Sequence, residues 1–122
     1  MSSVKTMQDL YAAFGRGDIL VVLGGMDSEI EWREAENNPY QPSGAFLKLG
    51  GEWDGFTVTP HEFHDAGDTV IVETRYTGTY KATGKSLDAQ ATHVWRLRDG
   101  KVVSFQQYVD TAQLQDVMGA RS

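Results

Sequence analysis

The sequence predicts an α+β fold in which N-terminal helices pack against one face of a curved antiparallel sheet. Two segments with helical character come first, and segments of alternating polarity follow after residue 53. Asp99-Gly100 is a strong two-residue hairpin signal between the last two of these segments. The apolar face of such a sheet must be buried, and the N-terminal helices can cover it. We expect the curvature of the sheet to leave a cavity for a ligand beneath it.

Two helices are expected at the N-terminus. Ser2 or Ser3 can cap the first, Gly15 can end it, and one of its faces is apolar through Val4, Met7, Leu10, Tyr11 and Phe14. The β-branched run 19–23 could form a strand. Asp18 at the N-cap position and Gly24-Gly25 at the end favour a short buried helix instead.

Five strands and a C-terminal helix account for most of the remaining chain. Residues 29–33 alternate and predict a short strand, 34–44 predict a loop, and 46–49 a short helix. Long strands are expected at 56–64, 69–80, 86–98 and 101–110, followed by a helix at 111–118. The 122 residues fit a single domain, 1–122.

The composition excludes several classes of protein. The net charge is -6 and the 11 Lys and Arg are scattered, which argues against nucleic acid and anionic membranes as partners. With no cysteine, a disulfide framework and a thiolate metal site are impossible. No apolar run approaches the roughly 20 residues of a membrane span, and the N-terminus lacks the apolar stretch of a secretory signal. We therefore expect a cytoplasmic protein.

Two residues are candidates for acid/base chemistry. Asp110 ends the last strand at the rim of the expected cavity, where apolar surroundings raise the pKa of a carboxyl group. Asp110 could instead cap the following helix, which is the commoner role of an aspartate at the start of such a segment. In the strand 86–98, alternation places His93 and Trp95 on one face. His93 could hydrogen-bond a ligand oxygen or serve as a paired core histidine.

The wall of the pocket is expected to be aromatic. Trp32, Trp95, Tyr108 and Tyr40 are the candidate ligand-binding residues, and each could instead be core packing. In the last strand, alternation yields two sets: Ser104, Gln106, Tyr108 and Asp110 against Val103, Phe105, Gln107 and Val109. The second, apolar set should face the helices, unless a bulge switches the parity partway. No metal site is expected, because strict alternation points His61 and His64 to opposite faces.

Five segments together resemble the SnoaL-like, ketosteroid-isomerase-related proteins of the nuclear-transport-factor-two-like superfamily. They are 10–18 (LYAAFGRGD), 30–32 (IEW), 52–56 (EWDGF), 93–103 (HVWRLRDGKVV) and 105–111 (FQQYVDT). The resemblance implies a cone-shaped, cystatin-like roll, a cofactor-free pocket and a homodimer. Asp110 matches the aspartate that related cyclases use near the end of the last strand, and His93 matches a histidine that recurs on the preceding strand. Relatives carry a longer segment where only residues 41–45 separate Tyr40 from Phe46 here.

The resemblance leaves the activity open, because one fold hosts many functions. The leading hypothesis is an isomerase or a cyclase/lyase that acts by general acid/base catalysis on a small apolar carbonyl compound. The alternative is a non-catalytic module that binds a hydrophobic small molecule. A third hypothesis is a dimerisation domain.

Overall fold

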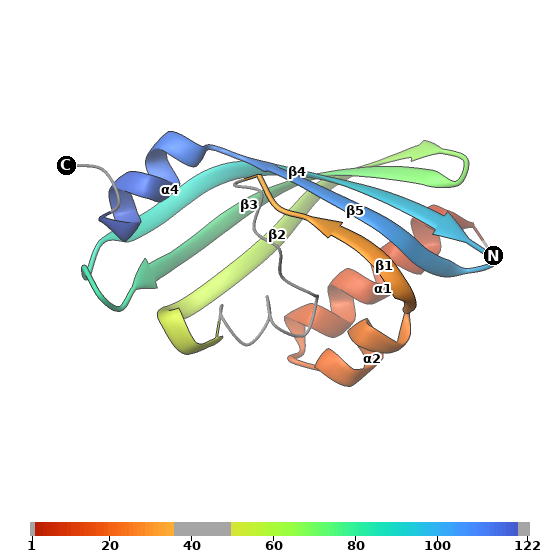
Figure 1. The fold of residues 1–122 in the computed structure, drawn as a ribbon, viewed down its shortest axis with the longest axis horizontal. Coiled ribbons are helices and arrows are strands. Elements are labelled where there is room, and N and C mark those ends of the chain that lie inside the picture. The colour runs from red at the N-terminus through yellow and green to blue at the C-terminus, as the bar shows by residue number, and fades with distance from the viewer. Residues whose placement is uncertain (1, 36–49, 120–122) are drawn as a thin grey trace.

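The computed structural model describes residues 2–35 and 50–119 (Figure 1). Its labelled helices lie near the two ends of the chain, and its strands lie between them. In chain order they are α1 (Ser3–Gly15), α2 (Ile19–Gly24), β1 (Met26–Arg33), β2 (Trp53–Ala66), β3 (Thr69–Tyr80), β4 (Ser86–Arg98), β5 (Lys101–Val109) and α4 (Thr111–Met118). The strands form one curved sheet in the order β1-β5-β4-β3-β2. Helices α1 and α2 lie against one end of the sheet and α4 against the other. This arrangement confirms the predicted α+β fold.

The two N-terminal helices form where the sequence predicts them. The Ser2 hydroxyl caps α1 by accepting the Lys5 backbone N–H at 3.1 Å, and the buried face of this helix consists of Met7, Leu10 and Ala13. The run 19–23 is helical, as predicted, although the Asp18 side chain makes no capping hydrogen bond. The expectation that this helix is buried is wrong for Leu20 and Val21, which are 84% and 49% exposed, whereas Val22 is buried.

β1 begins three residues earlier than the sequence predicts. It pairs with β5 in parallel, whereas every other strand pair is antiparallel. Met26 is the partner of Val102, and the Val102 N–H donates to the Gly25 carbonyl at 2.9 Å. Residues 26–28 do not alternate clearly in polarity, and they become strand through this long-range pairing.

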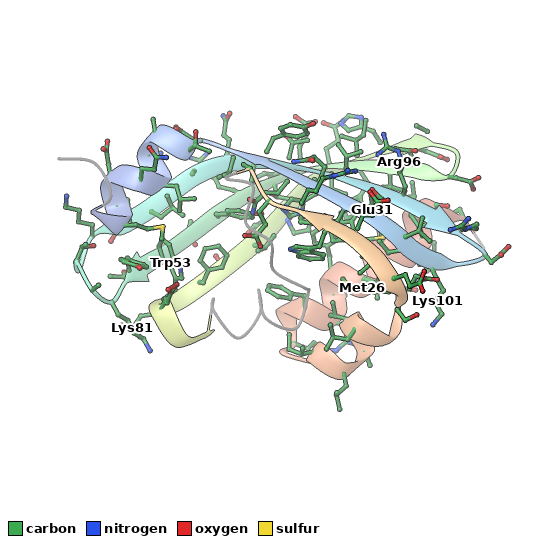
Figure 2. All side chains as sticks on the ribbon, in the orientation of Figure 1. Met26, Glu31, Trp53, Lys81, Arg96 and Lys101 are labelled. Atoms are coloured by element: carbon green, nitrogen blue, oxygen red, sulfur yellow. The ribbon has the colours of Figure 1, made fainter. Side chains whose placement is uncertain are left out.

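Two apolar clusters fill the helix-covered face of the sheet. The α1 cluster consists of Met7, Leu10, Ile30, Val70, Val72, Trp95, Leu97, Val102 and Phe105. The α4 cluster consists of Trp53, Tyr76, Leu87, Ala89, Ala91 and Val117. Exposed Arg96 lies on the opposite, outer face, while Trp53 lies beneath the sheet near α4 (Figure 2). Each large side chain in these clusters contributes about 1.5–3 kcal/mol by leaving water.

An irregularity in β5 decides which of its residues face the helices. Between β4 and β5 the register shifts next to Leu97 and Val102. Beyond this bulge, Phe105 pairs with Trp95 and Gln107 pairs with His93, so Phe105, Gln107 and Val109 face the helices. Tyr108 faces outward and is 57% exposed.

The first residues of β4 extend beyond the end of β5 and have no partner on that strand. Helix α4 covers part of this unpaired edge of β4. The last β4–β5 pair joins Ala91 to Val109. Beyond it, the Gln113 side-chain oxygen accepts the Asp88 backbone N–H at 3.0 Å. The Asp88 donor is therefore satisfied by a side chain in place of a neighbouring strand.

Several predictions lie outside the described residues: Tyr40, the short helix at 46–49, most of the loop 34–44, and the short segment 41–45. Of the helices described, none is long and apolar enough to cross a membrane.

Candidate functional site

A hydrogen-bonded network centred on His93 lies between the two apolar clusters. On β4, His93 stands between Ala91 of the α4 cluster and Trp95 of the α1 cluster, and it is 5% exposed. Its Nδ1 atom is hydrogen-bonded to the Tyr11 hydroxyl from α1. Its Nε2 atom is hydrogen-bonded to the Tyr76 hydroxyl from β3. Both ring nitrogens are therefore satisfied, as buried polar atoms require.

Each tyrosine also accepts a hydrogen bond from outside this trio. The Trp95 indole N–H donates to the Tyr11 hydroxyl at 2.8 Å. The Gln107 side-chain amide donates to the Tyr76 hydroxyl at 2.9 Å, while its oxygen accepts the Ala35 backbone N–H at 3.2 Å. The Ala35 contact fixes the orientation of the amide, since only the oxygen can accept. Residues from α1, β3, β4 and β5 thus converge on one imidazole.

Burial keeps all three central groups neutral near pH 7. Desolvation lowers the pKa of His93 to about 3, because the protein interior disfavours the imidazolium form. Desolvation raises the pKa of Tyr11 and of Tyr76, and the Glu34 carboxylate contributes further to the rise at Tyr76. His93 is therefore a neutral ring with one N–H donor and one acceptor nitrogen.

The number of hydrogens in the network leaves one tyrosine with an unused donor. One tyrosine donates to His93 and the other accepts from it. The accepting tyrosine receives a second hydrogen from Trp95 or Gln107, and its own O–H hydrogen then has no acceptor among the described residues. The same result holds for either tautomer. One tyrosine hydroxyl can therefore donate to an oxygen atom of a bound molecule.

Aromatic rings and one carboxylate flank this donor. Trp32 packs on Phe105 with ring centroids 4.1 Å apart, and Trp95 packs on Phe105 at 4.3 Å. The Trp32 indole N–H donates to the half-buried Glu34 carboxylate at 3.1 Å. Since Glu34 raises the pKa of Tyr76, its charge acts on the network itself.

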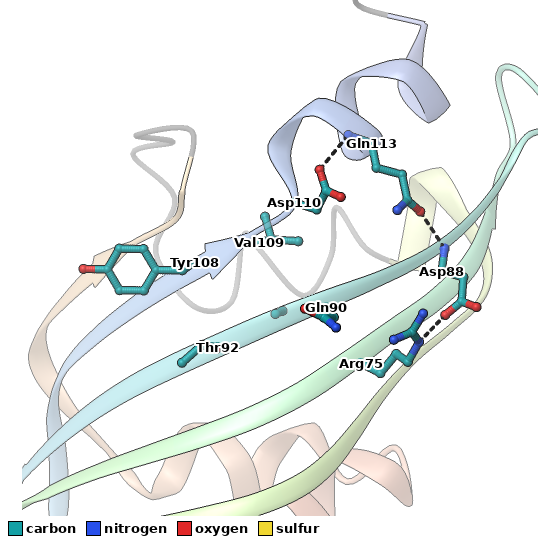
Figure 3. Close-up of a pocket in the computed structure, with 9 residues that line it drawn as sticks. Arg75, Asp88, Gln90, Thr92, Tyr108, Val109, Asp110 and Gln113 are labelled. Carbon is teal, nitrogen blue, oxygen red and sulfur yellow. Dashed lines mark hydrogen bonds and ion pairs between the residues drawn. The ribbon is translucent and has the colours of Figure 1, made fainter.

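The outer face of the sheet carries a separate, polar groove of about 480 Å³. It is lined by Arg75, Asp88, Gln90, Ala91, Thr92, Tyr108, Val109, Asp110 and Gln113 (Figure 3). Arg75 pairs with Asp88 at 2.5 Å. The Asp110 carboxylate accepts the Gln113 backbone N–H at 3.0 Å and so forms the N-cap of α4.

The model of the SnoaL-like domain matches residues 7–105, which is most of the chain. The protein belongs to the SnoaL-like family. Among curated proteins, none matches the chain.

Solved structures share this SnoaL-like fold over almost the whole chain. An NTF2-like protein from Burkholderia thailandensis is 38% identical, with 97% of this chain and 98% of that chain covered and a TM-score of 0.90. An NTF2-like protein of unknown function from Burkholderia pseudomallei is 26% identical, with 96% and 98% covered and a TM-score of 0.82. TerC, co-crystallised with polyporic acid, is 24% identical, with 95% and 97% covered and a TM-score of 0.82.

The SnoaL-like structure brings together some of the predicted site residues and separates others. The helix-covered face brings together His93, Trp95 and Trp32, and the ring centroids of Trp32 and Trp95 are 6.1 Å apart. Asp110 and Tyr108 line the groove on the outer face. The two candidate acid/base residues, Asp110 and His93, therefore do not share a pocket. This separation corrects the predicted arrangement. Its cause is that, beyond the bulge in β5, Phe105 and Gln107 face the helices while Tyr108 faces outward.

Four residues of this SnoaL-like site were missed by the sequence analysis: Tyr11, Glu34, Tyr76 and Gln107. Tyr76 shares the buried face of β3 with Val72, and the alternation of 69–80 could have shown this. Tyr11 already belonged to the apolar face of the first helix. Its contact with His93 joins residues 82 positions apart, and no local pattern predicts that contact.

Proposed function

We propose that this SnoaL-like protein is a cofactor-independent isomerase or cyclase that acts by acid/base catalysis on a small apolar carbonyl compound. The unused tyrosine O–H beside His93 supports the proposal. A carbonyl oxygen accepts this hydrogen, and it accepts it more strongly when negative charge develops there as a neighbouring C–H loses its proton. Aromatic side chains around the donor suit an apolar ligand.

The proposal assigns different roles to the residues of the network. A histidine whose pKa is about 3 is a weak base near pH 7, so His93 orients the two tyrosines and polarises the substrate oxygen through them. The proton acceptor is the Glu34 carboxylate, which lies near Tyr76. Glu34 takes a proton from the carbon next to the carbonyl. It returns the proton at a different carbon in an isomerisation. In a ring closure the enolate carbon attacks a second carbonyl, and the alkoxide formed there takes the proton back from Glu34.

The alternative function is binding without turnover. The low pKa of His93 favours it, because the buried imidazole itself contributes little to proton transfer near neutral pH. The same tyrosine hydroxyl would then fix the oxygen of a hydrophobic ligand. We also propose that the protein forms a homodimer, which light scattering in solution tests. The expected cytoplasmic location stays a prediction for cell fractionation.

The test is a ligand panel on five variants. Polyporic acid is a first probe, beside steroid ketones and linear aromatic polyketones. Glu34→Gln should retain binding and lose turnover. Of Tyr11→Phe and Tyr76→Phe, the variant that removes the unused O–H should weaken both. Tyr80→Phe is the matched control, since its hydroxyl bonds to no described residue. Asp110→Asn tests the sequence-based catalytic assignment of Asp110, and full activity in this variant confines Asp110 to its capping role.

The outcomes separate the two functions. Turnover that depends on Glu34 supports the enzyme. Binding that depends on Tyr11 or Tyr76, with no turnover by the wild type, supports the binding module. Equal binding by wild type, Tyr11→Phe and Tyr76→Phe contradicts both, because neither function then uses the network.

A further inference from the structure

A second cluster of polar side chains lies on the outer face of the sheet, at the pairing of β2 with β3. The register of this strand pair shifts between Pro60 and Glu62. Strict alternation placed His61 and His64 on opposite faces, and this bulge breaks that alternation, so that both histidines are exposed. Glu62 and His64 project outward together, two residues apart, and Glu62 is the cross-strand partner of Glu73.

The side chains of Glu62, His64 and Glu73 meet in one place. One imidazole nitrogen and one oxygen from each carboxylate all lie within 4.8 Å of one another. The His64 Nε2 atom is 2.7 Å from a Glu73 carboxylate oxygen. Within residues 2–35 and 50–119, no other group of three histidine or acidic side chains is so arranged.

The charges of this cluster are poorly balanced by the protein. Two carboxylates stand side by side, and none of the described Lys or Arg side chains forms an ion pair with either. A divalent cation held between the two carboxylates would neutralise both.

We propose that Glu62, His64 and Glu73 bind a divalent transition-metal ion such as Zn²⁺. One imidazole nitrogen with two carboxylate oxygens is a donor set that Zn²⁺ accepts. All three side chains are exposed, so small rotations about their own bonds can bring the donor atoms to bonding distance. The remaining coordination positions would be open to water. The site is on the face opposite His93, so it is independent of the proposed catalytic network.

The experiment is calorimetric titration of tag-free protein with Zn²⁺, followed by Co²⁺ titration read in the visible spectrum. We expect one ion per chain, and a Co²⁺ spectrum whose bands change when His64 is replaced. His64→Gln and Glu73→Gln should each weaken binding by roughly tenfold or more, because losses of that size already follow when residues that only support metal ligands are replaced.

Two matched controls define the site. His61→Gln removes an exposed imidazole three residues away, and Glu31→Gln removes an exposed carboxylate on β1. Both should bind Zn²⁺ like the wild type, and all four variants should keep the wild-type thermal midpoint. No binding by the wild type overturns the proposal. So does equal weakening by His61→Gln and His64→Gln, or unchanged binding in Glu73→Gln.

Discussion

Replacing Tyr76 with phenylalanine should destabilise the protein, although the ring remains in place. Tyr76 is 6% exposed and its hydroxyl holds two partners, His93 and Gln107. The variant leaves a buried imidazole nitrogen and an amide N–H without a bond. An unsatisfied buried group costs about 1–3 kcal/mol, and Gln107 is only half-buried, so we expect a loss of about 2–4 kcal/mol.

Urea denaturation followed by tryptophan fluorescence measures this loss. With a slope of about 1–3 kcal/mol/M, the midpoint should fall by roughly 0.7–4 M at an unchanged slope. Tyr80→Phe removes a hydroxyl that bonds to no described residue, so its midpoint should match the wild type. The total stability of such a domain is about 5–15 kcal/mol, which makes the difference between the variants easy to resolve.

One result refutes the reasoning directly. If Tyr76→Phe unfolds at the same urea concentration as Tyr80→Phe, the hydroxyl contributes nothing to the folded state. The network would then be no more than a set of close contacts, and the unused O–H would lose its significance for ligand binding.

Three further results are expected. Asp110→Ala should cost about 0.5–2 kcal/mol through loss of the α4 cap, whereas Asp110→Asn, which still accepts a hydrogen bond, should cost little; equal losses would contradict the capping role. His93 has a pKa of about 3 in the folded protein and an ordinary pKa of about 6.5 in the unfolded chain, so the unfolded chain binds the extra proton between these values. Stability should therefore fall by up to about 1.4 kcal/mol per pH unit as the pH drops from 6.5 toward 3. A denaturation series in His93→Gln should show a flatter pH dependence, and an unchanged one would be inconsistent with a neutral buried imidazole. In an NMR titration, the His64 pKa should lie above 6.5 in the wild type and move back toward 6.5 in Glu73→Gln; no movement would exclude the pair.

The sequence predicted the elements well because their signals are local. Alternation in 86–98 correctly placed His93 and Trp95 on the buried face, and Asp99-Gly100 does join β4 to β5. The start of β1 at Met26 was not predicted, since it depends on parallel pairing with a strand about 75 residues away, as the Met26–Val102 partnership shows. Local pattern thus yields the type of each element, and long-range pairing sets its ends.

The site was harder to predict, because it depends on register and on parity. Two bulges determine it: the one in β5 turns Tyr108 away from the helices, and the one in β2 turns Glu62 and His64 to the outer face. Asp110 illustrates a different limit. An aspartate between a strand and a helix suits a helix cap, the commoner role, and also a catalytic acid, and its bond to the Gln113 N–H supports the cap.

The bond between Gln113 and the Asp88 N–H also bears on how the chain avoids associating with itself. A bare strand edge invites a strand of another molecule to add to it, which is a common route to aggregation. Here the helix that follows β5 occupies the Asp88 donor with a side chain. A variant such as Gln113→Ala would expose that donor at the end of β4. Self-association on storage or heating should therefore increase before the fold itself is lost.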